Sequence, residues 1–460
     1  SRDTAGALVK VTDPQGRSLV LGYPARRSAE HFNGVTHIDS PVGRYGYAYG
    51  SAPKGPPANP RDLLANLVRV DLPGGIRRHY HFDDPAHPTL LTGISVAGEG
   101  ATGQGAKPQR VSTYAYDPQG RGILSVRGEP KRLGKEGKPV PGTGIEQIRL
   151  DFSTAGKTVL TNSLNQTTIY THAIVGNEYR LLRVAGAGCA SCGEANIQYG
   201  YDTLGRLTEI TKLSPTGQPL ATTRTERDTQ GRPLRISRLV YHNGQAQPSR
   251  LQVRYEYEGQ FTQPSLIARP SVIPGKEAVT RITYNAYGQP TQVAESGFSP
   301  LDDKGQASPT PITRTTTYVY RSINGRSLLA QIDGPLPNGS KGDPTDSDVT
   351  RVEWDRSGSA VVVMTPPGGY SSTVQYDAAG RIAEVSNAEN FKTTFTYDAA
   401  NRLIQTASSA QNWDKAGIKP VVHSYRYDAL GHMIETGTGG PANAADKTER
   451  HEEPYRPQTR

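Results

Sequence analysis

Aromatic and polar residues alternate in short runs that end at a recurring turn sequence. A period of two places alternate side chains on one face of an extended strand. After each turn an Arg precedes a second alternating run, as Leu207 and Glu209 follow Arg206. The pattern therefore predicts a strand, a tight turn and a second strand, repeated along the chain. The aromatic pairs before the turns are Tyr114/Tyr116, Tyr199/Tyr201, Tyr255/Tyr257, Tyr318/Tyr320, Phe395/Tyr397 and Tyr425/Tyr427.

The turn sequence itself is Tyr-Asp-x-x-Gly-Arg. An Asp at the first position accepts hydrogen bonds from backbone N–H groups further on, and Gly takes the left-handed position that closes a hairpin with a bulge. Asn401 replaces Gly in one copy, as expected of the residue that best tolerates positive φ. The predicted turn residues are Asp117 and Gly120, Asp202 and Gly205, Asp377 and Gly380, Asp398 and Asn401, and Asp428 and Gly431. Degenerate copies begin at Asp13, Asp228, Asn285 and Asp355.

These units predict an all-β fold with almost no helix: a long, spiralling antiparallel sheet of hairpins. A single hairpin is marginal, so each must pair with its neighbours, and the twist of the strands coils the sheet. We expect the Tyr rings to stack from hairpin to hairpin. The array should cover residues 1–440, with loop insertions near 51–61 and 128–144 and a flexible tail at 441–460.

Composition agrees with short strands and frequent turns. The 460 residues include 50 Gly, 35 Pro and 24 Tyr, and only 34% are hydrophobic. Helical bundles and βαβ proteins need longer apolar periodic segments than this chain contains. No stretch approaches the roughly 20 apolar residues of a membrane-spanning helix, so we expect no transmembrane segment.

The recurring motif resembles the YD or RHS repeat, found in bacterial polymorphic toxins, insecticidal toxin complexes and, distantly, teneurins. The resemblance extends from about Val11 to Gly439. It implies a sheet wound into a hollow shell that encloses a toxic C-terminal domain or presents a surface to receptors or glycans. Toxin-bearing members end in a self-cleavage segment and a toxin, neither of which we find here. Besides a shell that encloses its cargo, an open tube, a filament and a fragment of a larger shell therefore remain alternatives.

The net charge of +9 is spread along the chain, and many Arg residues occupy one repeat position. No basic run with interleaved aromatics is present, so we expect no specific nucleic-acid partner. The expected partners are a protein cargo or neighbouring copies of the chain. Exposed Tyr, Arg and Asp side chains would also suit a surface glycan.

Two short motifs carry candidate chemistry. Cys189 and Cys192 form a Cys-Ala-Ser-Cys sequence, for which we favour a structural disulfide. Free thiols, half of a metal site and a redox pair are the alternatives. His79 and His81 would share a strand face, which suits zinc, but a polar strand end is the simpler interpretation. We therefore expect no metal and no cofactor.

The sequence favours a non-enzymatic protein. It contains no Gly-x-Ser-x-Gly, P-loop or paired-carboxylate pattern, and the repeated Asp residues are too regular to form one active site. We expect a shell or scaffold of an exported RHS-type protein, secreted or on the surface of a bacterium, that encloses or presents a cargo or toxin domain. The alternative is an extracellular adhesin or fibre that assembles head to tail through open sheet edges.

Overall fold

The fold was analysed in a computed structural model of the chain. It describes residues 1–4, 6–24, 32–50, 64–98, 108–187, 195–298, 304–306, 310–336, 348–366, 370–409, 420–428, 430–439 and 450–451. Every regular element of this described part is a β-strand, and the strands belong to one antiparallel sheet. The predicted all-β fold is therefore confirmed.

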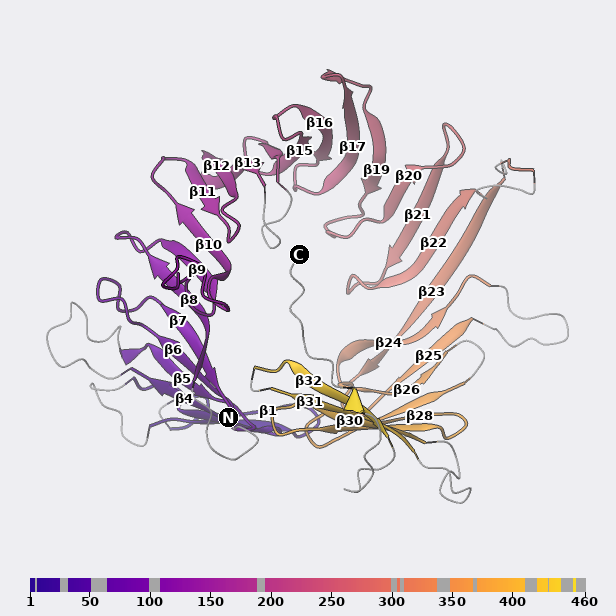
Figure 1. Cartoon of the computed structure of the whole chain (residues 1–460). Helices are drawn as coiled ribbons and strands as arrows, with labels where there is room; N and C mark the ends of the chain where they lie inside the picture. The colour runs from indigo at the N-terminus through magenta and orange to yellow at the C-terminus, as the bar shows by residue number, and fades with distance from the viewer. Residues whose placement is uncertain are drawn as a thin grey trace. The chain divides into compact units, whose positions relative to one another are not determined.

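The chain divides into two compact units, coloured by residue number in Figure 1. The first comprises residues 1–147, 323–326 and 352–460, and the second comprises 148–322 and 327–351. The first unit holds β1 (Lys10–Thr12), β2 (Ser18–Gly22), β3 (His37–Ser40), β4 (Gly43–Tyr49), β5 (Leu67–Asp71), β6 (Arg77–His81), β7 (Gly93–Ala97), β8 (Gln109–Tyr116), β9 (Gly122–Arg127), β26 (Val361–Thr365), β27 (Ser372–Tyr376), β28 (Ile382–Asn387), β29 (Lys392–Tyr397), β30 (Leu403–Ser409), β31 (Val421–Tyr427), β32 (Met433–Gly439) and β33 (Arg450–His451).

The second unit contains most of the middle of the chain. Four strands cross or touch a boundary between the units: β10 (Ile145–Asp151), β23 (Pro311–Ile323), β24 (Arg326–Asp333) and β25 (Val349–Trp354). The others are β11 (Lys157–Thr161), β12 (Thr167–Val175), β13 (Glu178–Gly186), β14 (Ile197–Tyr201), β15 (Leu207–Leu213), β16 (Pro219–Arg227), β17 (Pro233–His242), β18 (Gln245–Ala246), β19 (Arg250–Glu256), β20 (Leu266–Pro270), β21 (Glu277–Tyr284) and β22 (Pro290–Phe298).

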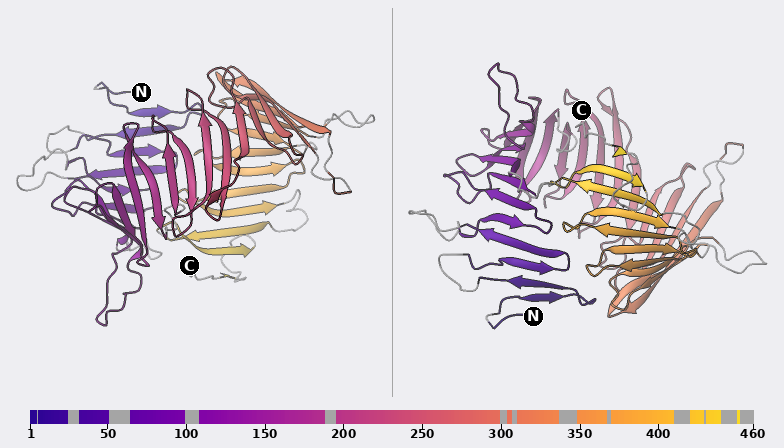
Figure 2. Two further views of the ribbon diagram at one scale, coloured as in Figure 1. Left: turned by 90° about the horizontal axis from the view of Figure 1, so that it is seen from above. Right: turned by 60° about the horizontal axis from the view of Figure 1, so that its bottom comes forward.

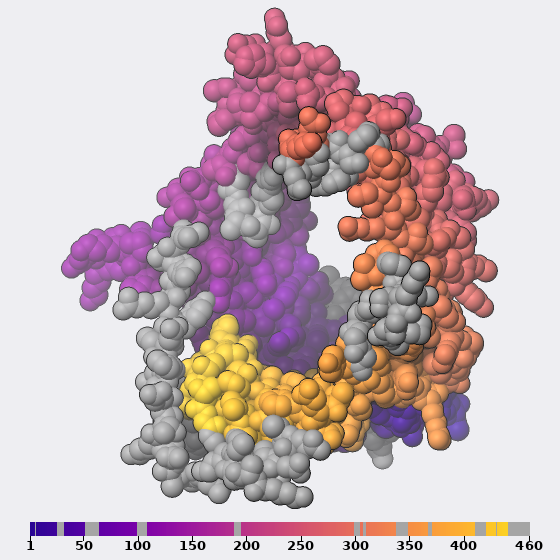
Figure 3. All heavy atoms as spheres, turned by 90° about the vertical axis from the view of Figure 1, so that its right-hand side faces the viewer, coloured from indigo at the N-terminus to yellow at the C-terminus, as the bar shows by residue number. Residues whose placement is uncertain are grey.

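Strands pair antiparallel in the order in which they follow one another along the chain (Figure 2). The exception is β18, a short turn-back on the tip of β17, so that β17 also pairs with β19. In the space-filling view of Figure 3, neighbouring colours accordingly lie side by side within each unit. Because hairpin connections alternate between the two edges of such a sheet, every second turn lies on the same edge.

The register slips at the same point of each repeat. In β29 and β30, Thr396 faces Gln405 but the next residue, Tyr397, faces Leu403. The same shift precedes the turns at Tyr116, Tyr201, Tyr284, Tyr376 and Tyr427. An extra residue in one strand is a β-bulge, which bends the strand and increases its twist. Each repeat therefore contributes one bend at its turn end.

The buried core is thin and follows the centres of the strands. Fully or nearly fully buried apolar side chains include Val126, Val184, Leu239, Val253 and Leu266, mostly one to a strand. Most other strand residues are only partly covered. Burial at the usual ~25 cal/mol per Å² of apolar surface thus stabilises each strand modestly. Side-chain bonds between hairpins must supply part of the cohesion.

Within the first unit, turns of the N-terminal strands contact turns of the C-terminal strands. The Gln15 side-chain amide donates to Asp355 Oδ2 at 2.8 Å. A Cβ at Gly380 would collide with the guanidinium of Arg17, and one at Gly74 would lie 2.9 Å from Ala400 Cβ. Gly380 therefore meets two demands, a positive φ of 81° and a close neighbour.

Of the two predicted insertions, only the one at 128–144 lies within the described residues. The segment near 51–61 lies outside the described residues, as do 441–449 and 452–460 of the predicted tail. Arg450–His451 of that tail forms β33 and pairs with β32. The 128–144 insertion contains an isolated bridge between Leu133 and Pro139. No helix among the described residues is long and apolar enough to cross a membrane.

We expect Gly120→Ala to loosen the β8–β9 hairpin and Gly122→Ala to leave it intact. Gly120 has φ +77° and space for a Cβ, so the cost is that of a left-handed Ala, about 1–2 kcal/mol. Gly122 lies in β9 with nothing within 4 Å of an added Cβ. Hydrogen exchange of the β8 and β9 amides measures the difference. Equal protection in both variants would contradict this explanation.

Candidate functional site

The most regular polar structure in the protein is its row of turns. In the turn after β14, Gly205 N–H donates to Asp202 O and Asp202 N–H donates to Arg206 O, both at 3.0 Å. Asp202 Oδ1 accepts from the backbone N–H groups of Leu204 at 3.0 Å and Arg206 at 2.9 Å. Arg206 Nε donates to Asp202 Oδ2 at 2.7 Å. One carboxylate thus holds both the backbone and the side chain of its own turn.

The same bonds recur at the other copies. The predicted Asp residues lie at the first turn position, and Gly120, Gly205, Gly380, Asn401 and Gly431 all have positive φ, between 65° and 89°. The Asp carboxylate accepts from the backbone N–H and the side chain four residues later at Asp13–Arg17, Asp117–Arg121, Asp228–Arg232, Asp377–Arg381, Asp398–Arg402 and Asp428–His432.

These bonds keep the turn carboxylates ionised. The backbone N–H of Arg206 lowers the pKa of Asp202 below its ordinary value of 3.8, against the effect of desolvation, and the Arg206 guanidinium lowers that pKa further. Hydrogen bonds and an opposite charge both favour the charged form of an acid. The turn Asp residues are therefore structural anions at neutral pH.

Each repeat Tyr reaches back to the preceding hairpin. Tyr397 OH donates to Ile382 O at 3.0 Å. The residue Ile382 directly follows the turn Arg381. Backbone pairing between β28 and β29 covers only 384–386 with 392–394, so the hydroxyl bond joins the two strands beyond the end of their ladder. The equivalent donors are Tyr49, Tyr116, Tyr201, Tyr257, Tyr284, Tyr320, Tyr376 and Tyr427.

The turn Arg connects consecutive repeats. Arg402 Nε donates to Asp398 of its own turn at 2.7 Å, and its Nη1 donates to the backbone O of Asp428 in the next turn at 2.8 Å. Its Cζ lies 5.0 Å from the ring centroid of Tyr427. Arg232 and Arg381 lie over the next Tyr at 4.5 Å and 4.4 Å. We call this series of Asp, Arg and Tyr contacts the turn ladder.

Divergent copies keep parts of the ladder with other residues. Arg227 stands where a Tyr is expected, and its Nε still donates to the carbonyl of Leu207, directly after Arg206. Phe261 lies 6.2 Å from the ring of Tyr284, where another repeat has a guanidinium. His432 replaces Arg and bonds Asp428 through Nδ1 at 3.0 Å. The positions are therefore defined by the bond they make more than by residue type.

The ladder differs from the prediction in the role of its rings. We expected the Tyr rings to stack on one another, but the ring pairs of the described residues do not join two repeat Tyr residues. Guanidinium groups lie over the rings instead. Sequence reasoning also missed the hydroxyl bond and the bridging Arg. Their signal was available, because Asp and Arg keep a spacing of four and Tyr directly precedes Asp.

The other predicted site residues are placed as follows. His79 and His81 lie in β6, and His81 Nε2 is 2.9 Å from Ser95 Oγ. Burial lowers the pKa of His81, and the nearby positive charge of Arg110 lowers it further. No group of three metal-ligating side chains occurs among the residues that the structure describes. Cys189 and Cys192 lie outside the described residues.

One family model and several solved structures are similar to this chain. The RHS repeat family model matches residues 376–412, which contain the turns at Asp377 and Asp398. A crystal structure of TcdB2-TccC3 is 14% identical, with 95% of this chain and 28% of that chain covered and a TM-score of 0.33. The Photorhabdus luminescens Tc holotoxin pore is 14% identical over 93% of this chain and 23% of that chain, with a TM-score of 0.34.

The chain thus spans less than a third of the length of these two structures. No curated protein matches the chain. The fold and the turn ladder define a repeat β-protein made of hairpins with Tyr-Asp-x-x-Gly-Arg turns. The RHS repeat model matches the part of the chain that contains two of these turns, and the same turn bonds recur in other described hairpins.

We expect Arg402→Lys to destabilise the first unit by about 1–3 kcal/mol, because Lys cannot bond its own Asp, the next turn and the next ring together. The matched control is Arg44→Lys. Among the described residues Arg44 pairs with Asp39, and the two side chains are 63% and 42% exposed. The free energy of unfolding should therefore fall by less than ~1 kcal/mol when Arg44 is replaced. Urea unfolding of both variants measures the change. Similar losses would show that the ladder contacts add nothing to an ordinary surface pair.

Acid should weaken the ladder. The lowered pKa values mean that the turn carboxylates stabilise the fold above the ordinary Asp pKa of 3.8 and lose this effect as the pH falls through their folded-state values. The urea midpoint should be level from about pH 8 to about pH 5 and should fall below about pH 4. Asp202→Asn should make the acid side of this profile shallower. An unchanged profile would refute the contribution of Asp202.

Proposed function

We propose that the chain is a wall of a protein shell or scaffold, which encloses or presents a protein cargo or toxin domain and catalyses no reaction itself. The carrying observation is the turn ladder. Its Asp, Arg and Tyr side chains bond one another and the backbone of adjacent hairpins. Asp, Arg and Tyr side chains serve catalysis or binding in many other proteins. In this chain they bond adjacent hairpins to one another.

The electrostatics of the ladder support a structural role. A general base works best when its pKa lies near the working pH, and the pKa values of the turn carboxylates Asp202 and Asp377 are instead lowered. Burial raises the pKa of Tyr257, so its hydroxyl stays protonated as a donor to Pro233 O. Neither group is poised for proton transfer at neutral pH.

A sheet with such a ladder suits a wall. Antiparallel pairing makes each hairpin continuous with its neighbours, and the ladder closes the strand ends beyond the backbone bonds. Repeats that contact mainly their neighbours can be extended without a growing core. We further propose that the chain acts outside the cytoplasm, as part of an exported bacterial protein.

We expect the purified chain to form discrete particles of its monomer mass, 49.6 kDa, because a wall segment should have no tendency to polymerise. Sedimentation velocity at low and high protein concentration, with electron microscopy of the same samples, measures mass and form. Filaments that lengthen with concentration would replace the shell proposal by the head-to-tail fibre. Binding to surface glycans stays a prediction from the sequence.

A further inference from the structure

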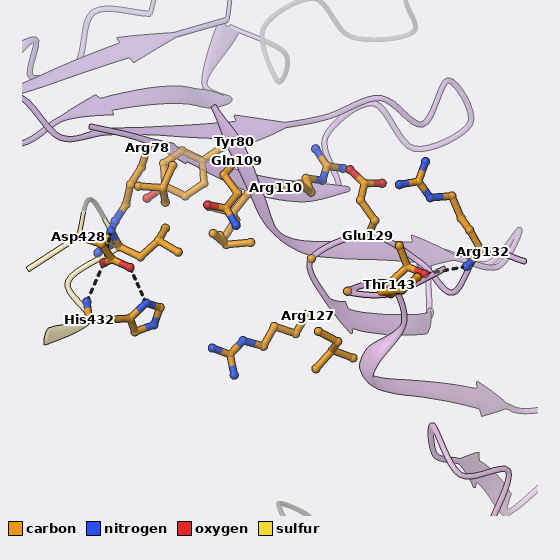
Figure 4. Close-up of a pocket in the computed structure, with 18 residues that line it drawn as sticks. Arg78, Tyr80, Gln109, Arg110, Arg127, Glu129, Arg132, Thr143, Asp428 and His432 are labelled. Carbon is orange, nitrogen blue, oxygen red and sulfur yellow. Dashed lines mark hydrogen bonds and ion pairs between the residues drawn. The ribbon is translucent and has the colours of Figure 1, made fainter. Parts of the chain in front are cut away.

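A concavity in the first unit lies next to one turn of the ladder, the turn that contains Asp428 and His432. Its volume is ≈ 920 Å³, within the range of ligand-binding pockets. One wall is formed by β6, β7 and β8, a second by the insertion at 128–144, and a third by the turn at 428–432 (Figure 4). The sequence predicted this insertion only as a loop.

Arginine dominates the polar lining. The lining contains two carboxylates, those of Glu129 and Asp428. It also contains four guanidinium groups, those of Arg78, Arg110, Arg127 and Arg132. The Asp428 carboxylate already accepts from the backbone N–H and Nδ1 of His432, at 2.8 Å and 3.0 Å. Four guanidinium groups against two carboxylates leave the lining with an excess of positive charge before His432 is counted.

The four guanidinium groups differ in what they bind. Arg110 donates to Thr92 O and Thr113 Oγ1, both at 3.1 Å. Arg127 Nη1 lies 3.6 Å from Glu146 Oε1. The side chains of Arg78 and Arg132 have no hydrogen bond or ion pair among the described residues, and both are exposed. Two unpaired guanidinium groups on separate walls are suited to two carboxylates of one ligand.

Much of the remaining lining is apolar, although Gln109 and Thr143 add two uncharged polar side chains. Ile94 and Val96 of β7 contribute to one wall with Val111 of β8, and Leu430 comes from the C-terminal turn. Apolar walls with a few charged groups suit a peptide that carries acidic side chains among aliphatic ones. Tyr80 is the one aromatic side chain that lines this pocket, whereas sugar recognition relies on stacking aromatics.

We propose that this pocket binds an acidic segment of a protein partner, whose carboxylates pair with Arg78 and Arg132. The proposal rests on the scaffold role and makes it specific: the partner is held by a local charge-complementary site on the wall. Asp428 and His432 limit the pocket on the side of the C-terminal turn, so its selectivity depends on residues from both ends of the sequence.

The test uses the full chain and a fluorescein-labelled hexaglutamate peptide, with binding followed by fluorescence anisotropy. The double variant Arg78→Gln/Arg132→Gln should weaken binding at least about tenfold, because each charged hydrogen bond contributes substantially. The matched control is Arg269→Gln/Arg314→Gln. These two exposed arginines line a second concavity of ≈ 520 Å³ in the second unit. Their substitution by Gln removes the same amount of positive charge as the pocket variant does.

Unchanged binding in the control and loss in the pocket variant support the proposal. Equal loss in both variants would show diffuse attraction to a basic protein and overturn it. A sulfated heparin oligosaccharide that binds where hexaglutamate does not would overturn it in favour of a glycan site. Absence of any hexaglutamate binding also refutes the pocket, while sedimentation and microscopy report separately on the scaffold. Circular dichroism of each variant confirms that folding is unaffected.

Discussion

The bond between each turn Asp and the Arg four residues later is the constraint on which the rest of the structure depends. It fixes the guanidinium plane, so that the same group can bond the next turn and lie over the next Tyr. A thin core cannot hold neighbouring hairpins in register by burial alone, since apolar burial is roughly proportional to area. The guanidinium that is fixed by its own turn also contacts the next hairpin. Each copy of the sequence motif therefore adds one contact between hairpins.

The fold was predictable because its signals are local. Alternation before the turn, a turn Asp and a residue that tolerates positive φ all lie within one hairpin, and Asn401 with φ 65° shows how closely residue type follows backbone conformation. Antiparallel pairing of successive strands then follows from short connections. The bulge at Tyr397 and Leu403 was foreseeable from the left-handed residue that closes the turn, although its effect on the bend was not.

The contacts between hairpins were less predictable. A Tyr stripe on one strand face is compatible with ring stacking and with hydroxyl bonds, and periodicity alone does not distinguish them. The choice depends on the distance between adjacent strand ends and on what the Arg side chain reaches. The pocket lay further beyond the sequence, because Arg78, Arg132 and Asp428 are distant in the chain and meet only when N-terminal and C-terminal strands of the first unit come together.

Several ladder positions hold a residue other than the one in the repeat motif. Arg227 replaces Tyr, His432 replaces Arg and Asn285 replaces Asp, yet each still makes a bond within or between hairpins. The residue type at a ladder position can change without disrupting the sheet, as long as the bond is kept. Because these side chains are already bonded, they offer few free groups for a ligand. Insertions outside the repeated turns are not constrained in this way. The 128–144 insertion carries an unpaired Arg132 at the rim of a pocket because no turn requires that side chain. In this repeat wall the turn bonds hold the sheet together, and the insertion adds to the pocket a side chain that those bonds do not use.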